Sequence, residues 1–131
     1  MIHHLSFAVA DLPRSARFYD AVLKALGYKR VAANEGFVGW GRKKGEDLFA
    51  IKIRERGVRI PGPGFHLAFA APSRRAVDAF HRAALKHGGQ DNGGTGLHLE
   101  YGPHYYAAFV FDPDGYRIEA AITPASIRDR R

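Results

Sequence analysis

The candidate functional residues of this sequence of 131 residues are histidines, tyrosines and carboxylates. The sequence contains no cysteine. This absence excludes disulfides, thiolate zinc sites and cysteine nucleophiles, so a bound metal must use His, Asp or Glu. Two histidines begin similar segments, His4-Leu5-Ser6-Phe7-Ala8 and His66-Leu67-Ala68-Phe69-Ala70. Neutral imidazole binds Fe, Mn, Co, Ni and Zn, and two His with one carboxylate leave positions open for a substrate. The matched histidines are therefore candidate metal ligands.

The two similar segments belong to an internal repeat whose offset is nearly half the chain. The same offset, kept without a gap, also pairs Phe18 with Phe80 and Gly27 with Gly89. Self-similarity at a fixed spacing is typical of a duplicated supersecondary unit. We expect each unit to contain a strand, a helix and about three further strands, which makes an α+β fold.

Local patterns predict where the elements of each unit lie. Alternating apolar residues predict a strand around 5–9, and Asp11-Leu12-Pro13 opens a helix that ends near Gly27. A second helix is expected from Ser73 to Gly88. Further strands are expected at about 35–41, 47–53, 104–111 and 116–122, with a weaker candidate at 29–34. The sequence Asp112-Pro113-Asp114-Gly115 is typical of a type I turn between the last two strands.

The chain is expected to form a single domain over residues 1–131, since domains typically hold roughly 100 to 150 residues. Its first module covers about residues 1–55 and its second about residues 65–123. The linker between them, at about 56–64, contains two Pro-Gly dipeptides.

Strand alternation assigns the candidate ligands to one face of the predicted sheets. Leu5 and Leu67 are expected to lie under the helices, which leaves His4 and His66 on the opposite face. In the last strand the same rule places Glu119 opposite the apolar row. If that face is concave, the small residues beside these three side chains leave room for an ion and a ligand.

Four segments carry a resemblance that covers nearly the whole chain: Ile2-His3-His4-Leu5 through Asp11, Arg17-Phe18-Tyr19-Asp20, Phe65-His66-Leu67-Ala68, and Asp112-Pro113-Asp114-Gly115-Tyr116-Arg117-Ile118-Glu119. The chain resembles the vicinal oxygen chelate superfamily, which includes glyoxalase I, extradiol dioxygenases, fosfomycin-resistance enzymes and bleomycin-binding proteins. The resemblance implies two tandem βαβββ modules that form a curled mixed sheet around a divalent metal. It also implies that His4, His66 and Glu119 are the metal ligands.

A lysine is expected where the resemblance implies a fourth ligand. Glyoxalase I carries a carboxylate near the end of its first module, and pairing Ile51 with Ile118 puts Lys52 at that position. A protonated ammonium has no lone pair and repels a cation, which argues against four-ligand glyoxalase chemistry. Lys52 is expected either to bind an anionic group of a substrate or to lie solvated at the surface.

Further candidate side chains surround the predicted cavity. By strand parity, His104 and Tyr106 are expected to reach it and to act with Glu119 as acid-base catalysts, or else to pack only. Trp40 and Phe37 are expected to line a groove for an aromatic ligand.

The charge of the chain favours a small-molecule partner over a polymer or a membrane. Twenty Lys and Arg against 13 Asp and Glu give a formal net charge of +7, but the basic residues are scattered without an aromatic stacking ladder. We therefore expect no nucleic-acid partner. No segment resembles a signal peptide or a membrane span, so a cytoplasmic protein is expected.

Three functions are compatible with these residues. The leading hypothesis is a metal-dependent enzyme (a lyase or isomerase, a dioxygenase or a thiol transferase) whose substrate chelates the ion through vicinal oxygens. The second is a binding protein that sequesters an aromatic or antibiotic ligand without turnover, and the third is a dimeric scaffold that has lost the metal. The resemblance implies a homodimer, with the site either within one chain or shared between two.

Overall fold

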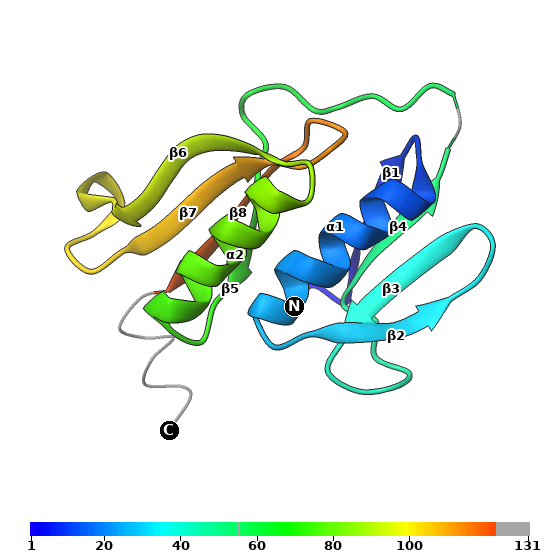
Figure 1. Ribbon diagram of the computed structural model, residues 1–131, viewed down its shortest axis with the longest axis horizontal. Coiled ribbons are helices and arrows are strands. Elements are labelled where there is room, and N and C mark those ends of the chain that lie inside the picture. Colours follow the sequence, from blue (N-terminus) through cyan, green and yellow to red (C-terminus); the bar gives the residue numbers. More distant parts are fainter. Residues whose placement is uncertain (55, 123–131) are drawn as a thin grey trace.

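The computed structural model describes residues 1–54 and 56–122 (Figure 1). The ends predicted for the two modules, at about 55 and 123, lie outside the described residues. The first half contains β1 (Leu5–Val9), α1 (Leu12–Ala25), β2 (Lys29–Ala33), β3 (Phe37–Gly41) and β4 (Phe49–Ile53). The second half contains β5 (Leu67–Ala70), α2 (Arg74–Lys86), β6 (Gln90–Leu97), the short 3-10 helix η1 (Leu99–Tyr101), β7 (Tyr106–Phe111) and β8 (Arg117–Ile122).

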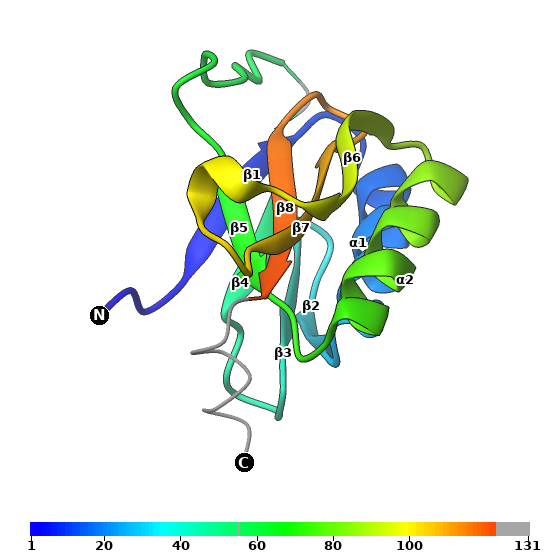
Figure 2. The same ribbon diagram turned by 90° about the vertical axis from the view of Figure 1, so that its left-hand side faces the viewer.

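Each half folds as one βαβββ module with its own mixed sheet. The strand orders are β1-β4-β3-β2 and β5-β8-β7-β6, and in both sheets the first and last strands of the module pair in parallel. Figures 1 and 2 show α1 and α2 side by side on the same side of the two sheets. The predicted α+β fold of two repeated modules is therefore confirmed. No helix among the described residues is long and apolar enough to cross a membrane.

Both helices begin at the capping residues that their sequences predict. The Asp11 side chain accepts a hydrogen bond from the Arg14 amide at 3.0 Å, and Ser73 does the same for the Ala76 amide at 3.1 Å. After α1 the chain turns at Gly27, whose φ of 94° is costly for residues with a side chain. These signals set the ends of the helices that cover the sheets.

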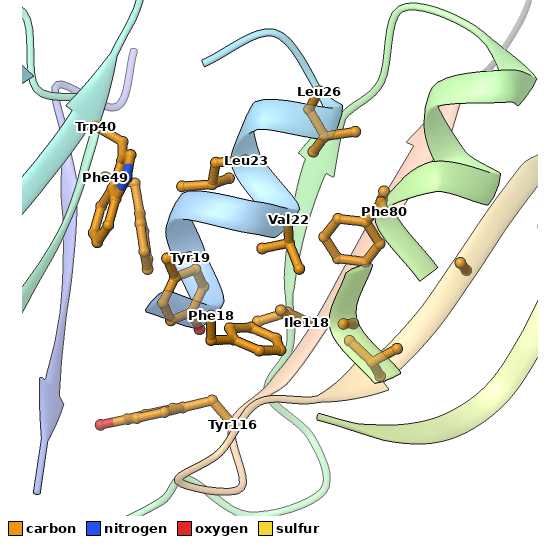
Figure 3. Close-up of a cluster of buried hydrophobic side chains, with 14 of the residues drawn as sticks. Phe18, Tyr19, Val22, Leu23, Leu26, Trp40, Phe49, Phe80, Tyr116 and Ile118 are labelled. Carbon is orange, nitrogen blue, oxygen red and sulfur yellow. The ribbon is translucent and has the colours of Figure 1, made fainter. Parts of the chain in front are cut away.

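The two modules share one hydrophobic core. Figure 3 shows Phe18 and Val22 of α1 directed toward Phe80 of α2, and all three are 0 % exposed. At the other side of α1, Tyr19 packs against Phe49, with ring centroids 4.8 Å apart. Burial of aromatic side chains from both halves makes each module depend on the other for stability.

A polar tie joins the start of α1 to the turn between β7 and β8. One carboxylate oxygen of Asp114 accepts from the Ala10 amide at 3.1 Å and from the Arg14 guanidinium at 2.9 Å. The other oxygen accepts from the Ser15 hydroxyl at 2.9 Å. The Gly115 amide donates to the Asp112 carbonyl at 2.9 Å, which closes the predicted turn. This turn therefore also fixes the first module against the second.

Strand β6 was not predicted, because its sequence is rich in residues that disfavour strands. It contains Asp91, Asn92, Gly93 and Gly94, yet it pairs with β7 on both sides of Asn92 and Gly93. The pairing shifts register between Asp91 and Gly94, and the two glycines adopt positive φ angles of 127° and 74°. Pairing with a buried neighbour here outweighs local propensity. The weaker strand candidate near 29–34 is confirmed as β2.

Candidate metal and substrate site

Two of the three predicted ligands meet on the second sheet. His66 directly precedes β5, and Glu119 lies on β8 opposite Ala68 in the parallel ladder. The His66 Nε2 atom lies 2.8 Å from Glu119 Oε1. The carboxylate is 1 % exposed, while the imidazole is 54 % exposed. A buried acid is thus directed at a histidine that solvent and ligands can reach.

Tyr105 is the third member of this cluster, although the sequence patterns pointed to its neighbour. Its hydroxyl donates to Glu119 Oε2 at 2.8 Å. Desolvation, and next the hydrogen bond to Glu119, raise the pKa of Tyr105 to about 12. The phenol is therefore protonated near neutral pH and acts as a donor to the carboxylate. Each oxygen of Glu119 has a different partner.

A cavity of about 360 Å³ lies beside the His66 and Glu119 pair. Its lining includes His66, His98, Tyr101, Phe109 and Arg117. It combines two imidazoles and a guanidinium with two aromatic rings, a mixture that suits a small polar ligand with an apolar part.

His4 directly precedes β1 of the first sheet and lines a different cavity. This second cavity, of about 250 Å³, is also lined by Ser6, Phe37, Asp47, Ala50 and Lys52. His4 is exposed, and its Nδ1 lies 2.8 Å from that of His3. Within residues 1–54 and 56–122, no three His, Asp or Glu side chains are close enough to hold a metal. One chain therefore brings together His66 and Glu119 but leaves His4 apart.

The strand registers correct the predicted position of Lys52. Leu5 pairs with Phe49 in the first sheet, and the repeat-related Leu67 pairs with Ile118 in the second. The residue that corresponds to Glu119 is therefore Ala50, which pairs with Ser6 as Glu119 pairs with Ala68.

Lys52 lies two residues further along the same face and is exposed. The prediction that a lysine replaces the fourth ligand was wrong, because matching apolar residues fixed the face of the strand but not its register. A methyl group at Ala50 neither coordinates nor repels an ion.

Three other candidates do not line the cavity beside His66 and Glu119. The Tyr106 hydroxyl donates at 2.6 Å to Asp78 of α2, so Tyr106 faces the helix and not the cavity. Trp40 is 1 % exposed and donates from Nε1 to Asp20 at 2.9 Å, also on the helix side. His104 is exposed and is not among the residues that line the cavity beside His66.

The prediction for Tyr106 failed because the row that it shares with Ala108 and Val110 is the buried, helix-facing row. Because side chains alternate between the two faces of a strand, a buried row that includes Tyr106 places Tyr105 on the other face, toward the cavity. The same rule applies to Trp40, which lies on the same face of its strand as the buried Val38.

Comparison with known proteins agrees with this fold. Residues 1–120 match the family model of the Glyoxalase/Bleomycin resistance protein/Dioxygenase superfamily. The chain belongs to this superfamily. The superfamily includes metal-dependent enzymes and fosfomycin resistance proteins, so membership alone does not specify a reaction.

Individual relatives within the superfamily cover nearly the whole chain. A glyoxalase/bleomycin resistance protein from Albidiferax ferrireducens T118 has a crystal structure that is 32% identical, with a TM-score of 0.79, over 93% of this chain and 98% of that one. The uncharacterized protein YqjT of Bacillus subtilis (strain 168) is 29% identical over 90% of this chain and 95% of its own length. The fosfomycin resistance protein FosX from Mesorhizobium loti shares the fold, with a TM-score of 0.65 and 19% identity over 95% and 93% of the two chains.

The donor atoms of the second module suit the divalent metals that enzymes of this superfamily use. Imidazole nitrogen and carboxylate oxygen bind such ions at about 2.0–2.2 Å. Donors separated by 2.8 Å, as His66 Nε2 and Glu119 Oε1 are, fit neighbouring positions around one ion. The second module thus contains two of the three predicted donors, and His4 occupies the repeat-related position in the first.

Proposed function

We propose that the protein is a metal-dependent enzyme whose small substrate chelates a divalent ion through vicinal oxygens. His66 and Glu119 hold the ion, and His4 completes the set. The ion is Fe, Mn, Co, Ni or Zn, for which imidazole and carboxylate are suitable ligands. The observation that carries this proposal is the buried carboxylate of Glu119, held 2.8 Å from an accessible imidazole and beside a cavity.

We propose that His4 comes from a second copy of the chain. His4 and His66 line separate cavities in one chain, and each cavity opens on a sheet face with its own polar residues. In a symmetric homodimer, the first module of one copy covers the second module of the other. Two equivalent sites then form, each from His4 of one protomer and the His66 and Glu119 pair of its partner.

The residues of the first module support the binding of an anionic substrate in such a site. When bound, the ion would supply Lewis acid chemistry at the chelating oxygens of the substrate. Ala50 and Ser6 are small and leave room where a fourth ligand would stand. Lys52 lies on the same face and offers an ammonium group to an anionic group of the substrate.

Metal analysis with paired variants tests the ligand set and its location. Untagged wild-type protein is expected to bind about one divalent ion per chain, and His4→Ala and Glu119→Gln are each expected to lose it. Mixing these two variants, with exchange of subunits, restores about a quarter of the sites if each site is shared, because half of the dimers are mixed and each has one intact site. No recovery would place the site within one chain. A wild-type protein that binds no ion would refute the proposal.

A second candidate function is the binding of an aromatic ligand without turnover. Tyr101 and Phe109 present aromatic rings in the cavity beside His66, and proteins named for bleomycin resistance belong to the same superfamily. Binding of aromatic ligands by metal-free protein, unchanged in His66→Ala, would favour sequestration over catalysis.

A further inference from the structure

We propose that Tyr105 is a positioning residue, which holds one oxygen of Glu119 so that the carboxylate binds the metal through its other oxygen alone. This inference rests on the proposed function, because it concerns the metal ligand Glu119. It assigns a role to a tyrosine that the sequence patterns did not single out.

The two oxygens of Glu119 are already divided between two partners. Oε1 lies 2.8 Å from His66 Nε2, and Oε2 accepts the hydrogen bond of the Tyr105 hydroxyl at 2.8 Å. An ionised carboxylate only accepts hydrogen bonds, so a phenol that donates to Oε2 competes with an ion for that oxygen. Oε1 faces the imidazole with which it would share the metal. A carboxylate that binds through one oxygen occupies one coordination position of the ion instead of two. This leaves more positions for a chelating substrate, which occupies two.

Tyr105 is held firmly enough to impose this orientation. Its carbonyl accepts from the His98 amide at 2.8 Å, and its amide donates to the Gly102 carbonyl at 3.3 Å. Its ring packs against that of Tyr101, with centroids 5.3 Å apart. The residue is thus tied to the segment between β6 and β7 by its backbone on both sides and by its ring. Partners that orient a ligand in this way typically change metal affinity by about 10- to 100-fold when removed.

Tyr106 provides a matched control within the same chain. Its hydroxyl donates to the Asp78 carboxylate at 2.6 Å, also as a hydrogen bond from a tyrosine to an acid. The bond lies on the opposite face, against α2, where no metal ligand is proposed. Tyr105→Phe and Tyr106→Phe therefore remove the same chemical group from neighbouring residues, but only the first removes a contact of Glu119.

The test measures Co²⁺ binding by full-length protein that has been stripped of metal. Wild type and Tyr106→Phe are expected to bind Co²⁺ with dissociation constants within about twofold of each other and with the same visible absorption spectrum. Tyr105→Phe is expected to bind about 10- to 100-fold more weakly, because the carboxylate loses the partner that orients it. Its spectrum is expected to change, because the carboxylate is then free to bind through both oxygens. Far-ultraviolet circular dichroism and urea unfolding check that each variant is folded.

The outcomes separate this inference from the proposal on which it rests. If wild type binds Co²⁺ and Tyr105→Phe matches it in affinity and spectrum, Tyr105 does not position Glu119, and the metal site still stands. If wild type binds no Co²⁺, the proposed function fails and this inference fails with it. Should Tyr105→Phe not fold, Tyr105→Gln, which keeps a donor, is compared with Tyr105→Met, which has none. Tighter binding by the glutamine variant supports the inference, and equal binding refutes it.

Discussion

Replacing Asp112 by asparagine is expected to change how the stability of the protein depends on pH. Asp112 is 3% exposed, and its Oδ1 accepts from the Asp114 and Tyr116 amides, each at 2.9 Å. Its Oδ2 accepts from the Tyr19 hydroxyl at 2.5 Å. Burial raises the pKa of Asp112 from 3.8 to about 6, and these hydrogen bonds only partly oppose the rise.

The sign and size of the effect follow from that pKa. The folded protein binds the proton more tightly than the unfolded chain, so the contribution to stability is complete below pH 3.8 and is lost as the pH rises through about 6. A rise from 3.8 to about 6 corresponds to about 3 kcal/mol, at about 1.36 kcal/mol per pH unit. The asparagine side chain of the variant stays neutral throughout, and its amide oxygen can still accept the two backbone hydrogen bonds.

Urea unfolding of both proteins at several pH values from 4 to 7 measures this contribution. The free energy of unfolding of Asp112→Asn, minus that of wild type, is expected to rise by up to about 3 kcal/mol from pH 4 to pH 7. Tyr19→Phe removes a donor that favours the carboxylate, so it is expected to shift the transition to higher pH. A difference that stays constant within about 0.5 kcal/mol would refute the reasoning, because Asp112 would then not titrate in this range.

Three further substitutions, and Gly62→Ala as a control, test the packing and the tie between the modules by urea unfolding. A Cβ at Gly41 would lie 1.7 Å from the Glu46 carbonyl oxygen, so Gly41→Ala is expected to lower the free energy of unfolding by about 3 kcal/mol. Gly62 has open space around it, so Gly62→Ala is expected to change that free energy by no more than about 0.5 kcal/mol. Asp114→Ala loses the hydrogen bonds from three donors of the first module and is expected to cost about 3 kcal/mol; a loss below about 1 kcal/mol would contradict the tie. Phe80→Ala removes a side chain that is 0 % exposed and is expected to cost about 3–5 kcal/mol, and a smaller cost would mean that the core collapses around the gap.

The repeat allowed the two modules to be predicted. Both helices could be predicted because capping residues and apolar periodicity act locally. Asp11 and Ser73 cap their helices as expected, and the turn at 112–115 forms where its residues indicate. Strand β6 escaped prediction because pairing with β7 stabilises it against its own glycine-rich sequence. The two strands are separated in the sequence, so their pairing cannot be predicted from a short stretch of residues.

The candidate site was predicted less completely than the fold, because it depends on the register of the strands and on the face to which each side chain points. Alternation placed Glu119 and Lys52 on the correct faces, but the position along the strand depends on hydrogen bonds to β5 and β1. Choosing Tyr106 over Tyr105 was instead an error of face, since both faces of β7 carry apolar residues. Strand alternation predicted that His66 and Glu119 share a face, whereas the separation of His4 from them depends on how the two modules pack.

The contacts of Asp114 also bear on the order in which this chain acquires its structure. Ribosomes release the start of α1 long before they make the turn at 112–115, so Ala10, Arg14 and Ser15 emerge without their acceptor. Contacts between residues so distant in sequence slow folding, because the intervening chain must be ordered before they form. The nascent first module therefore reaches its final state only after the turn at 112–115 has been synthesised.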